Sequence, residues 1–175
     1  IESLYDDLST DRLEIDMIDF SGPAFQYVDN RLMSLQLVKL GMTDAVIFNS
    51  EGNNMLPADI LYKKNIFAVR GSFRPVTRVN IDMFEHGLEM FNQDNACDHE
   101  NTQILFEITI SNLRAAGDID ERDFLDRVDI LGTLGYTVMI SNFSEYYRMV
   151  DYFSTFTNQH IGVAMGVNNL LDVFD

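Results

Sequence analysis

The sequence predicts an α/β protein with a doubly wound, mostly parallel sheet of about six strands in three layers. Two observations support this fold class. Short apolar runs recur along the chain, and the segments between them carry apolar residues at helical spacing. Strands that alternate with helices form parallel pairs joined by right-handed crossovers, and helices must then cover both faces of the sheet.

The strands are expected where apolar, β-branched and aromatic residues cluster between turn residues. Six such runs occur, at residues 13–20, 44–49, 66–69, 102–110, 136–140 and 161–165. The run at 102–110, Thr-Gln-Ile-Leu-Phe-Glu-Ile-Thr-Ile, has a composition strongly typical of a strand. In the first run Leu13, Ile15 and Met17 share one face.

Helices are expected between these strands and at both ends of the chain. The helical patterns cover residues 1–8, 28–40, 58–62, 80–91, 118–134, 144–156 and the segment from 168 onward. Capping residues support several boundaries. Thr77 or Asn80 can cap the helix that follows the third strand. Asp118 with Glu121 forms a capping signal for the clearest helix of the chain, which Gly135 ends.

Length and charge restrict the classes of function. The 175 residues suit one domain, and 28 acids against 12 lysines and arginines give a formal net charge of −16. Nucleic acid and anionic membrane surfaces require a net basic face, so neither is expected as a partner. No apolar run approaches the ~20 residues of a membrane span and no signal-peptide pattern opens the chain, so we expect a cytoplasmic protein. We also expect residues 1–175 to be a single domain excised from a longer chain.

Metal and cysteine chemistry are not expected, and the sequence identifies no cofactor. Cys97, the single cysteine, lies near His99 in a polar stretch that lacks the paired spacing of a zinc site. Asp16 and Asp19 can be imagined as Mg²⁺ ligands at a strand end. Carboxylates without a fixed ligand set are more often solvated or paired, so no metal site is predicted there.

One stretch reverses the acidic character of the chain. Residues 63–78 hold five cations and no acid, and they connect the third strand to the next helix. At such a turn the backbone N–H groups and the helix dipole favour an anion. Arginine forks, hydroxyl groups and a glycine that allows close approach suit a phosphate. The residues predicted to bind it are Arg70, Gly71, Ser72, Arg74, Thr77, Arg78 and Asn80. The alternative is that these arginines pair with the surplus carboxylates.

The fold class also predicts where ligands bind. In a doubly wound sheet they lie outside the carboxyl ends of the strands. The loops expected at that edge are 19–23, 49–53, 70–80, 110–112 and 141–144. Because the basic loop is one of them, the functional site is predicted at this edge.

A resemblance to a known family rests on Gly71-Ser-Phe-Arg-Pro-Val-Thr-Arg-Val-Asn80. This stretch resembles the Gly-Ser-Phe-x-Pro-x-Thr-x-x-His turn of nicotinamide or nicotinate mononucleotide adenylyltransferases. In that family the turn holds the ATP phosphates, and the His stabilises the charge of adenylyl transfer. Here Asn80 stands in place of that His, and an amide can donate a hydrogen bond but cannot carry the positive charge.

A wider pattern includes Asp19-Phe-Ser-Gly-Pro-Ala-Phe and Ile140-Ser-Asn-Phe. It is similar to a largely uncharacterised bacterial family whose members are labelled nicotinate-nucleotide adenylyltransferase or TonB-dependent receptor. A second likeness is to haloacid-dehalogenase-like phosphatases, whose Asp-x-Asp strand end is matched by Glu107 and Thr109. Glu107 would replace the nucleophilic Asp and Thr109 the acid/base Asp, so phosphoryl transfer is not predicted.

Three hypotheses about function follow from the sequence. The first is a domain that binds a phosphorylated small molecule or nucleotide at residues 70–80 without clear catalytic residues. The second is a divergent nicotinate/nicotinamide mononucleotide adenylyltransferase in which Arg74, Thr77 and Asn80 orient a triphosphate. The third is a structural or oligomerisation module. Six aromatic residues fall within 143–156, and the helix from Tyr146 to Phe156 either packs within the core or docks against a second copy or another part of the chain.

Overall fold

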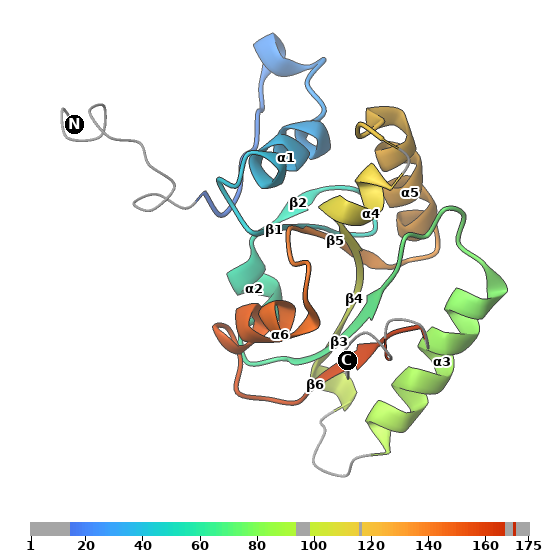
Figure 1. Cartoon of the computed structure of the whole chain (residues 1–175). Coiled ribbons are helices and arrows are strands. Elements are labelled where there is room, and N and C mark those ends of the chain that lie inside the picture. The colour runs from blue at the N-terminus through green and yellow to red at the C-terminus, as the bar shows by residue number, and fades with distance from the viewer. Residues whose placement is uncertain (1–14, 94–98, 116, 167–169, 171–175) are drawn as a thin grey trace.

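The computed structural model describes residues 15–93, 99–115, 117–166 and 170. The helix expected at 1–8 and Cys97 lie outside the described residues. Of the segment from 168 onward, only residue 170 is described. The chain has an α/β fold around one sheet (Figure 1). Its strands are β1 (Ala45–Phe48), β2 (Asn54–Met55), β3 (Asn65–Arg70), β4 (Thr102–Thr109), β5 (Thr137–Ser141) and β6 (Ile161–Ala164). Its α-helices are α1 (Asn30–Lys39), α2 (Pro57–Leu61), α3 (Arg78–Asn92), α4 (Ile110–Arg114), α5 (Glu121–Thr133) and α6 (Tyr146–Ser154).

The sheet is mixed but mostly parallel, in the order β2-β1-β5-β4-β3-β6. Strands β5, β4, β3 and β6 run parallel, and β1 runs antiparallel to both β2 and β5. The expected α/β class and the mostly parallel sheet are therefore confirmed, whereas the parallel direction expected for the strand at 44–49 is wrong. The sequence could not give that direction because every residue of β1 is buried, and a uniformly apolar run carries no signal for it.

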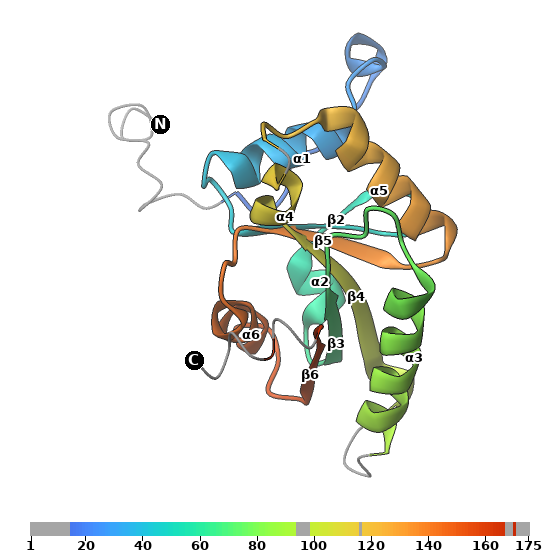
Figure 2. The same cartoon turned by 45° about the vertical axis from the view of Figure 1, so that its right-hand side comes forward.

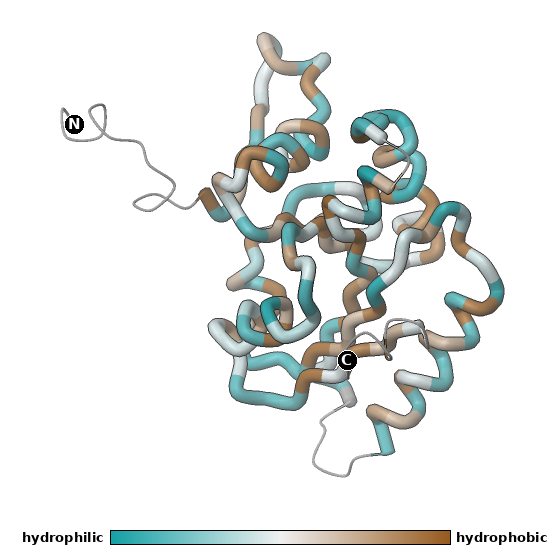
Figure 3. The backbone as a smooth tube through the Cα atoms, viewed as in Figure 1, coloured by the Kyte–Doolittle hydropathy of each residue, from teal (hydrophilic) through white to brown (hydrophobic). Residues whose placement is uncertain are grey.

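Helices pack on both faces of the sheet, as the two views of Figures 1 and 2 show. One hydrophobic cluster joins the sheet to α1, α3, α4 and α5. A second cluster joins the opposite face to α2 and α6. Successive strand residues alternate between the two, so Phe67 and Val69 belong to the first cluster and Ile66 and Ala68 to the second. Hydrophobic and hydrophilic residues alternate along the outer helices in Figure 3, as expected for helices that bury one side.

The strand expected at 13–20 is not found in its described part. Residues 15–20 run alongside the sheet without joining it. Isolated hydrogen bonds hold them: the backbone N–H of Ile15 donates to the carbonyl of Met42 at 3.2 Å, the side chain of Asn54 donates to the carbonyl of Ile18 at 2.7 Å, and the Asn30 side chain bonds to Asp19 and Phe20. The sheet edge next to β1 is formed by the two-residue strand β2.

The helix boundaries depend on side-chain caps. Thr77 and Asn80, offered as alternatives by the sequence, act together: Thr77 caps α3, and the Asn80 side chain accepts from the Thr77 backbone N–H at 2.9 Å. Asp120 rather than Asp118 caps α5. The short helix α4 was not predicted. None of the helices in the described ranges is long and apolar enough to cross a membrane.

The packing of α5 generates the first prediction. A Cβ atom built on Gly132 would lie 2.6 Å from the backbone oxygen of Ser50, which no rotamer change can relieve. Gly132→Ala should therefore lower the free energy of unfolding by about 1–2 kcal/mol, although alanine has the higher helix propensity. The measurement is urea denaturation, with Thr133→Ala, an exposed change on the same helix, as the control. Higher stability of Gly132→Ala would contradict this packing.

The cap of α1 generates the second prediction. The Asp29 side chain accepts from the Arg31 backbone N–H at 3.0 Å and forms an ion pair with the Arg31 guanidinium at 2.8 Å. The hydrogen bonds from Arg31 hold the pKa of Asp29 below its ordinary value of 3.8. A lowered carboxyl pKa stabilises the fold above the unfolded-state value, and this contribution is lost as the pH falls through the folded-state value.

The variant that isolates this charge is Asp29→Asn, because asparagine is also a good N-cap. The wild type should exceed the variant in free energy of unfolding at neutral pH, and the difference should shrink as the pH falls below about 4. Urea denaturation at a series of pH values and constant ionic strength measures it. A difference that does not change with pH would assign the effect to the cap alone.

Candidate functional site

The ends of three neighbouring strands, β3, β4 and β5, surround a hollow. Arg70 pairs in register with Glu107, and Thr109 pairs with Ser141. The strands are parallel, so the loops that follow them meet at one edge. We name the space between these loops the strand-end hollow. It has a volume of about 820 Å³ and is lined by Arg70, Gly71, Ser72, Thr109, Ser111, Asn112, Ser144, Glu145, Tyr146 and Tyr147.

An ion pair lies beneath this hollow, between Arg70 and Glu107. The Nε and Nη2 atoms of Arg70 donate to the two carboxylate oxygens of Glu107 at 2.5 and 2.9 Å. Arg70 is 6% exposed and Glu107 is fully buried. Side chains alternate between the two faces of the sheet, and both Arg70 and Glu107 lie on the face that packs against α6. On each strand the charged residue follows apolar residues of that face, at the carboxyl edge of the sheet.

Further contacts complete the surroundings of this pair. The Ser141 hydroxyl donates to Glu107 at 2.5 Å, and Arg70 Nη1 donates to the Ser144 carbonyl at 3.2 Å. The Tyr146 ring lies over the guanidinium at 4.4 Å, and Arg70 Nη2 contacts the Met149 sulfur at 3.8 Å. These contacts use four of the five N–H donors of Arg70, so one N–H group of Nη1 has no hydrogen bond within the described residues.

The loop after β3 takes its shape from a buried phenylalanine. Phe73 has a positive φ of 46°, is almost fully buried, and packs against Phe106 with ring centroids 5.3 Å apart. A Cβ on Gly71 would lie 2.9 Å from the Phe73 ring. The glycine that the sequence assigned to ligand approach is therefore also required for packing. A positive φ at a bulky residue costs of order 1–3 kcal/mol, which burial of the ring offsets.

An arginine of α5 holds the same loop, and sequence reasoning missed it. Arg127 is 3% exposed, and its Nη1 donates to the carbonyl of Ser72 at 2.9 Å. Its Nη2 donates to Asp123, which also forms an ion pair with Arg74 at 3.0 Å. Nothing in the sequence distinguished Arg127 from the other charged residues of the helix. Its role depends on the contact between α5 and a loop 55 residues away.

The residues predicted to bind phosphate are only partly brought together. Arg70, Gly71 and Ser72 line the strand-end hollow, and Arg74, Thr77, Arg78 and Asn80 do not. Thr77 and Asn80 bond to each other, and Arg78 lies on an apolar groove between α3 and α5. The alternative expected from the sequence, that these arginines pair with carboxylates of the chain, is found for Arg70 and Arg74.

Two of the five loops expected at the carboxyl edge do not lie there. The loop 49–53 joins β1 to β2 and lies at the opposite edge, because β1 is antiparallel to β5. The segment 19–23 follows no strand. The loops 70–80 and 141–144 do follow β3 and β5, and residues 110–112, which follow β4, form the start of α4 instead of a loop. The sequence located the second and third of these without selecting Ser111, Asn112 or Ser144 within them.

The aromatic helix α6 packs mainly within the chain. Met149 and Phe153 are buried, and Tyr152 and Phe156 pack against the cluster that contains them. Tyr147, at the rim of the hollow, is 60% exposed. No group of three or more His, Cys, Asp and Glu side chains in the described part of the chain is placed to hold a metal ion.

Comparison of the chain with protein-family models, with curated proteins and with solved structures found no match. Conclusions about function therefore rest on the geometry of the site.

The third prediction concerns the buried ion pair. Glu107→Gln leaves the Arg70 charge buried without a partner and should lower the free energy of unfolding by about 3–5 kcal/mol. The double change Arg70→Met with Glu107→Leu removes both charges and should cost less than Glu107→Gln alone. Chemical denaturation of this double variant and of its two single variants, Arg70→Met and Glu107→Leu, in a double-mutant cycle measures the coupling. Additive single changes would show that the two side chains do not act as a pair.

Proposed function

We propose that this protein binds a phosphorylated small molecule in the strand-end hollow. One observation carries the proposal. Arg70 and the hydroxyl or amide side chains of Ser72, Thr109, Ser111 and Asn112 line a single hollow at the carboxyl ends of three parallel strands. Hydroxyl, amide and guanidinium groups donate hydrogen bonds, and phosphate oxygens accept them.

The charge balance of the hollow determines how such a ligand would be held. Glu107 neutralises Arg70, so Arg70 offers one directed N–H group instead of an unpaired charge. Glu145 is the acid at the rim, and its carboxylate accepts from the Ser144 hydroxyl at 2.9 Å and pairs with Arg148 at 3.1 Å. This pairing weakens its repulsion of an anion. Affinity would then come from several neutral donors and from the start of α6, whose dipole favours negative charge.

The topology gives further support. Along the chain β3, β4 and β5 are added in one direction across the sheet, and β6 then crosses to the other side of β3. We infer from this order that the parallel part is doubly wound in three layers. In such sheets ligands lie at the carboxyl edge, which is the edge where the hollow lies.

The geometry favours binding over adenylyl transfer. The three residues that would orient a triphosphate have other contacts: Arg74 pairs with Asp123, and Thr77 and Asn80 form the cap of α3. The purely structural alternative is less favoured, because most aromatic residues of α6 pack against the sheet of their own chain.

The experiment is a thermal unfolding series with inorganic phosphate, ribose 5-phosphate, nicotinate mononucleotide and ATP. A ligand at a hundredfold over its dissociation constant should stabilise the fold by about 2.7 kcal/mol, a rise of a few degrees in Tm. Ser111→Asp places a carboxylate at an exposed position of the hollow and should abolish the rise.

The matched control is Arg78→Ala, an exposed cation of the basic stretch outside the hollow, which should keep the full rise. Loss of the rise in Arg78→Ala but not in Ser111→Asp would move the site to the start of α3. Absence of a rise with every phosphorylated ligand would refute the proposal.

A further inference from the structure

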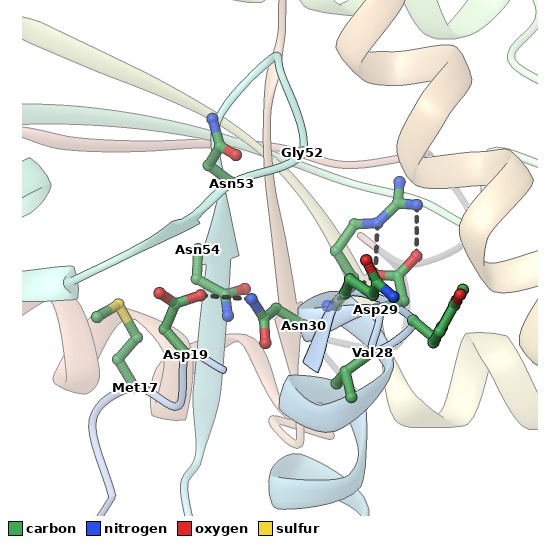
Figure 4. Close-up of a pocket in the computed structure, with 11 residues that line it drawn as sticks. Met17, Asp19, Val28, Asp29, Asn30, Gly52, Asn53 and Asn54 are labelled. Carbon is green, nitrogen blue, oxygen red and sulfur yellow. Dashed lines mark hydrogen bonds and ion pairs between the residues drawn. The ribbon is translucent and has the colours of Figure 1, made fainter. Parts of the chain in front are cut away.

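A second hollow lies beside the turn between β1 and β2, and it shares no residue with the strand-end hollow. We name it the turn hollow. It is formed by three segments: Met17 with Asp19, residues 26–31 at the start of α1, and residues 52–54 in the turn before β2 (Figure 4). Its volume of about 650 Å³ is in the range of small-molecule sites. Most of the residues that line it carry carboxylate, amide or guanidinium groups.

Hydrogen bonds and ion pairs within the chain hold three polar side chains of the turn hollow in position: Asp19, Asn30 and Arg31. Asn30 accepts from the Phe20 backbone N–H at 2.8 Å and donates to one carboxylate oxygen of Asp19. Figure 4 shows Asp19, Asn30 and Asn54 next to one another on the wall of the hollow. Arg31 is held by Asp29 and by Asp129 of α5. Fixed groups lose little conformational entropy on binding.

The groups left for a ligand include both acceptors and donors. Asp19 keeps its second carboxylate oxygen, and Asn53 keeps its side-chain oxygen, since only its amide nitrogen is bonded, to Glu51 at 3.1 Å. Arg31 uses three of its five N–H donors, so two remain. The Gln26 amide makes no side-chain hydrogen bond within the described residues. A ligand fits these groups if it both donates and accepts hydrogen bonds at neighbouring positions. A hydroxyl group both donates and accepts, so a ligand with several hydroxyl groups meets this requirement.

Charge and ring chemistry narrow the class of ligand. An anion is disfavoured because the Asp19 carboxylate lines the hollow and has no ion pair among the described residues. A metal ion lacks a cluster of ligands in the same part of the chain. Tyr27 is 92% exposed beside these polar groups. An open aromatic face next to hydrogen-bonding groups suits a ring that has one apolar C–H face and hydroxyl groups around it.

We propose that the turn hollow is a binding site for a neutral sugar, with the Tyr27 ring against one face of the pyranose and Asp19, Gln26, Arg31 and Asn53 bonded to its hydroxyl groups. This site is independent of the phosphate site proposed above.

The test is titration of the isotope-labelled chain with glucose, galactose, N-acetylglucosamine and maltose into the tens of millimolar, followed by backbone amide NMR. At least one sugar should shift the amide signals of residues 26–31 and 52–54 and leave those of 70–72 unchanged. Tyr27→Ala should weaken binding about fivefold. Asp19→Asn, which keeps the acceptor for Asn30 and removes the charge, should weaken it about tenfold.

Two controls keep the test sharp. Tyr62→Ala removes a tyrosine that is 60% exposed and lies outside the hollow, and it should bind sugar as the wild type does. Putrescine, a dication, is titrated in parallel to test whether the hollow binds a cation instead of a sugar. The absence of sugar-dependent shifts, equal affinity of Tyr27→Ala and wild type, or salt-dependent binding of putrescine in place of sugar would each overturn the proposal.

Discussion

The arrangement of this protein depends on the buried ion pair between Arg70 and Glu107. Burying two charges costs several kcal/mol per ion, and only good geometry and additional hydrogen bonds offset that cost. The two residues face each other in register on β3 and β4, Ser141 of β5 completes the carboxylate, and Tyr146 covers the guanidinium. The pair thereby ties together three strand ends and the start of α6. The walls of the strand-end hollow are the elements that this pair holds in place.

The same pair explains how an acidic chain uses its few cations. Five arginines form ion pairs within the described residues: Arg31, Arg70, Arg74, Arg127 and Arg148. Because the chain has many carboxylates, most of its described arginines form ion pairs within the chain. The positive charge that the sequence concentrates at residues 63–78 is therefore neutralised within the chain at Arg70 and Arg74. The binding proposed at each hollow would rely on directed hydrogen bonds, since the arginine at each is already neutralised.

The loop after β3 shows how a local motif acquires its meaning from the rest of the fold. Its glycine and its two capping residues resemble a phosphate-binding turn in sequence. In the structure Phe73 is drawn into the core, Arg127 holds the carbonyl of Ser72, and Thr77 bonds to Asn80. Packing and capping account for most of the motif, and only its first residues remain at the hollow. The use of this turn in phosphate binding stays a prediction.

Sequence alone predicts the α/β class, five of the strands, the positions of α1, α2, α3, α5 and α6, and three of the segments at the carboxyl edge. These features follow from local periodicity, caps and turn residues, which short windows of sequence contain. The other features of the fold depend on tertiary structure. The direction of β1, the exclusion of residues 15–20 from the sheet, the role of Arg127 and the pairing of Arg70 with Glu107 all depend on contacts between segments far apart in the chain. A uniformly apolar strand carries no sequence signal for its direction in the sheet, and the sequence around a charged residue does not identify its partner. These properties are therefore set only when the chain folds.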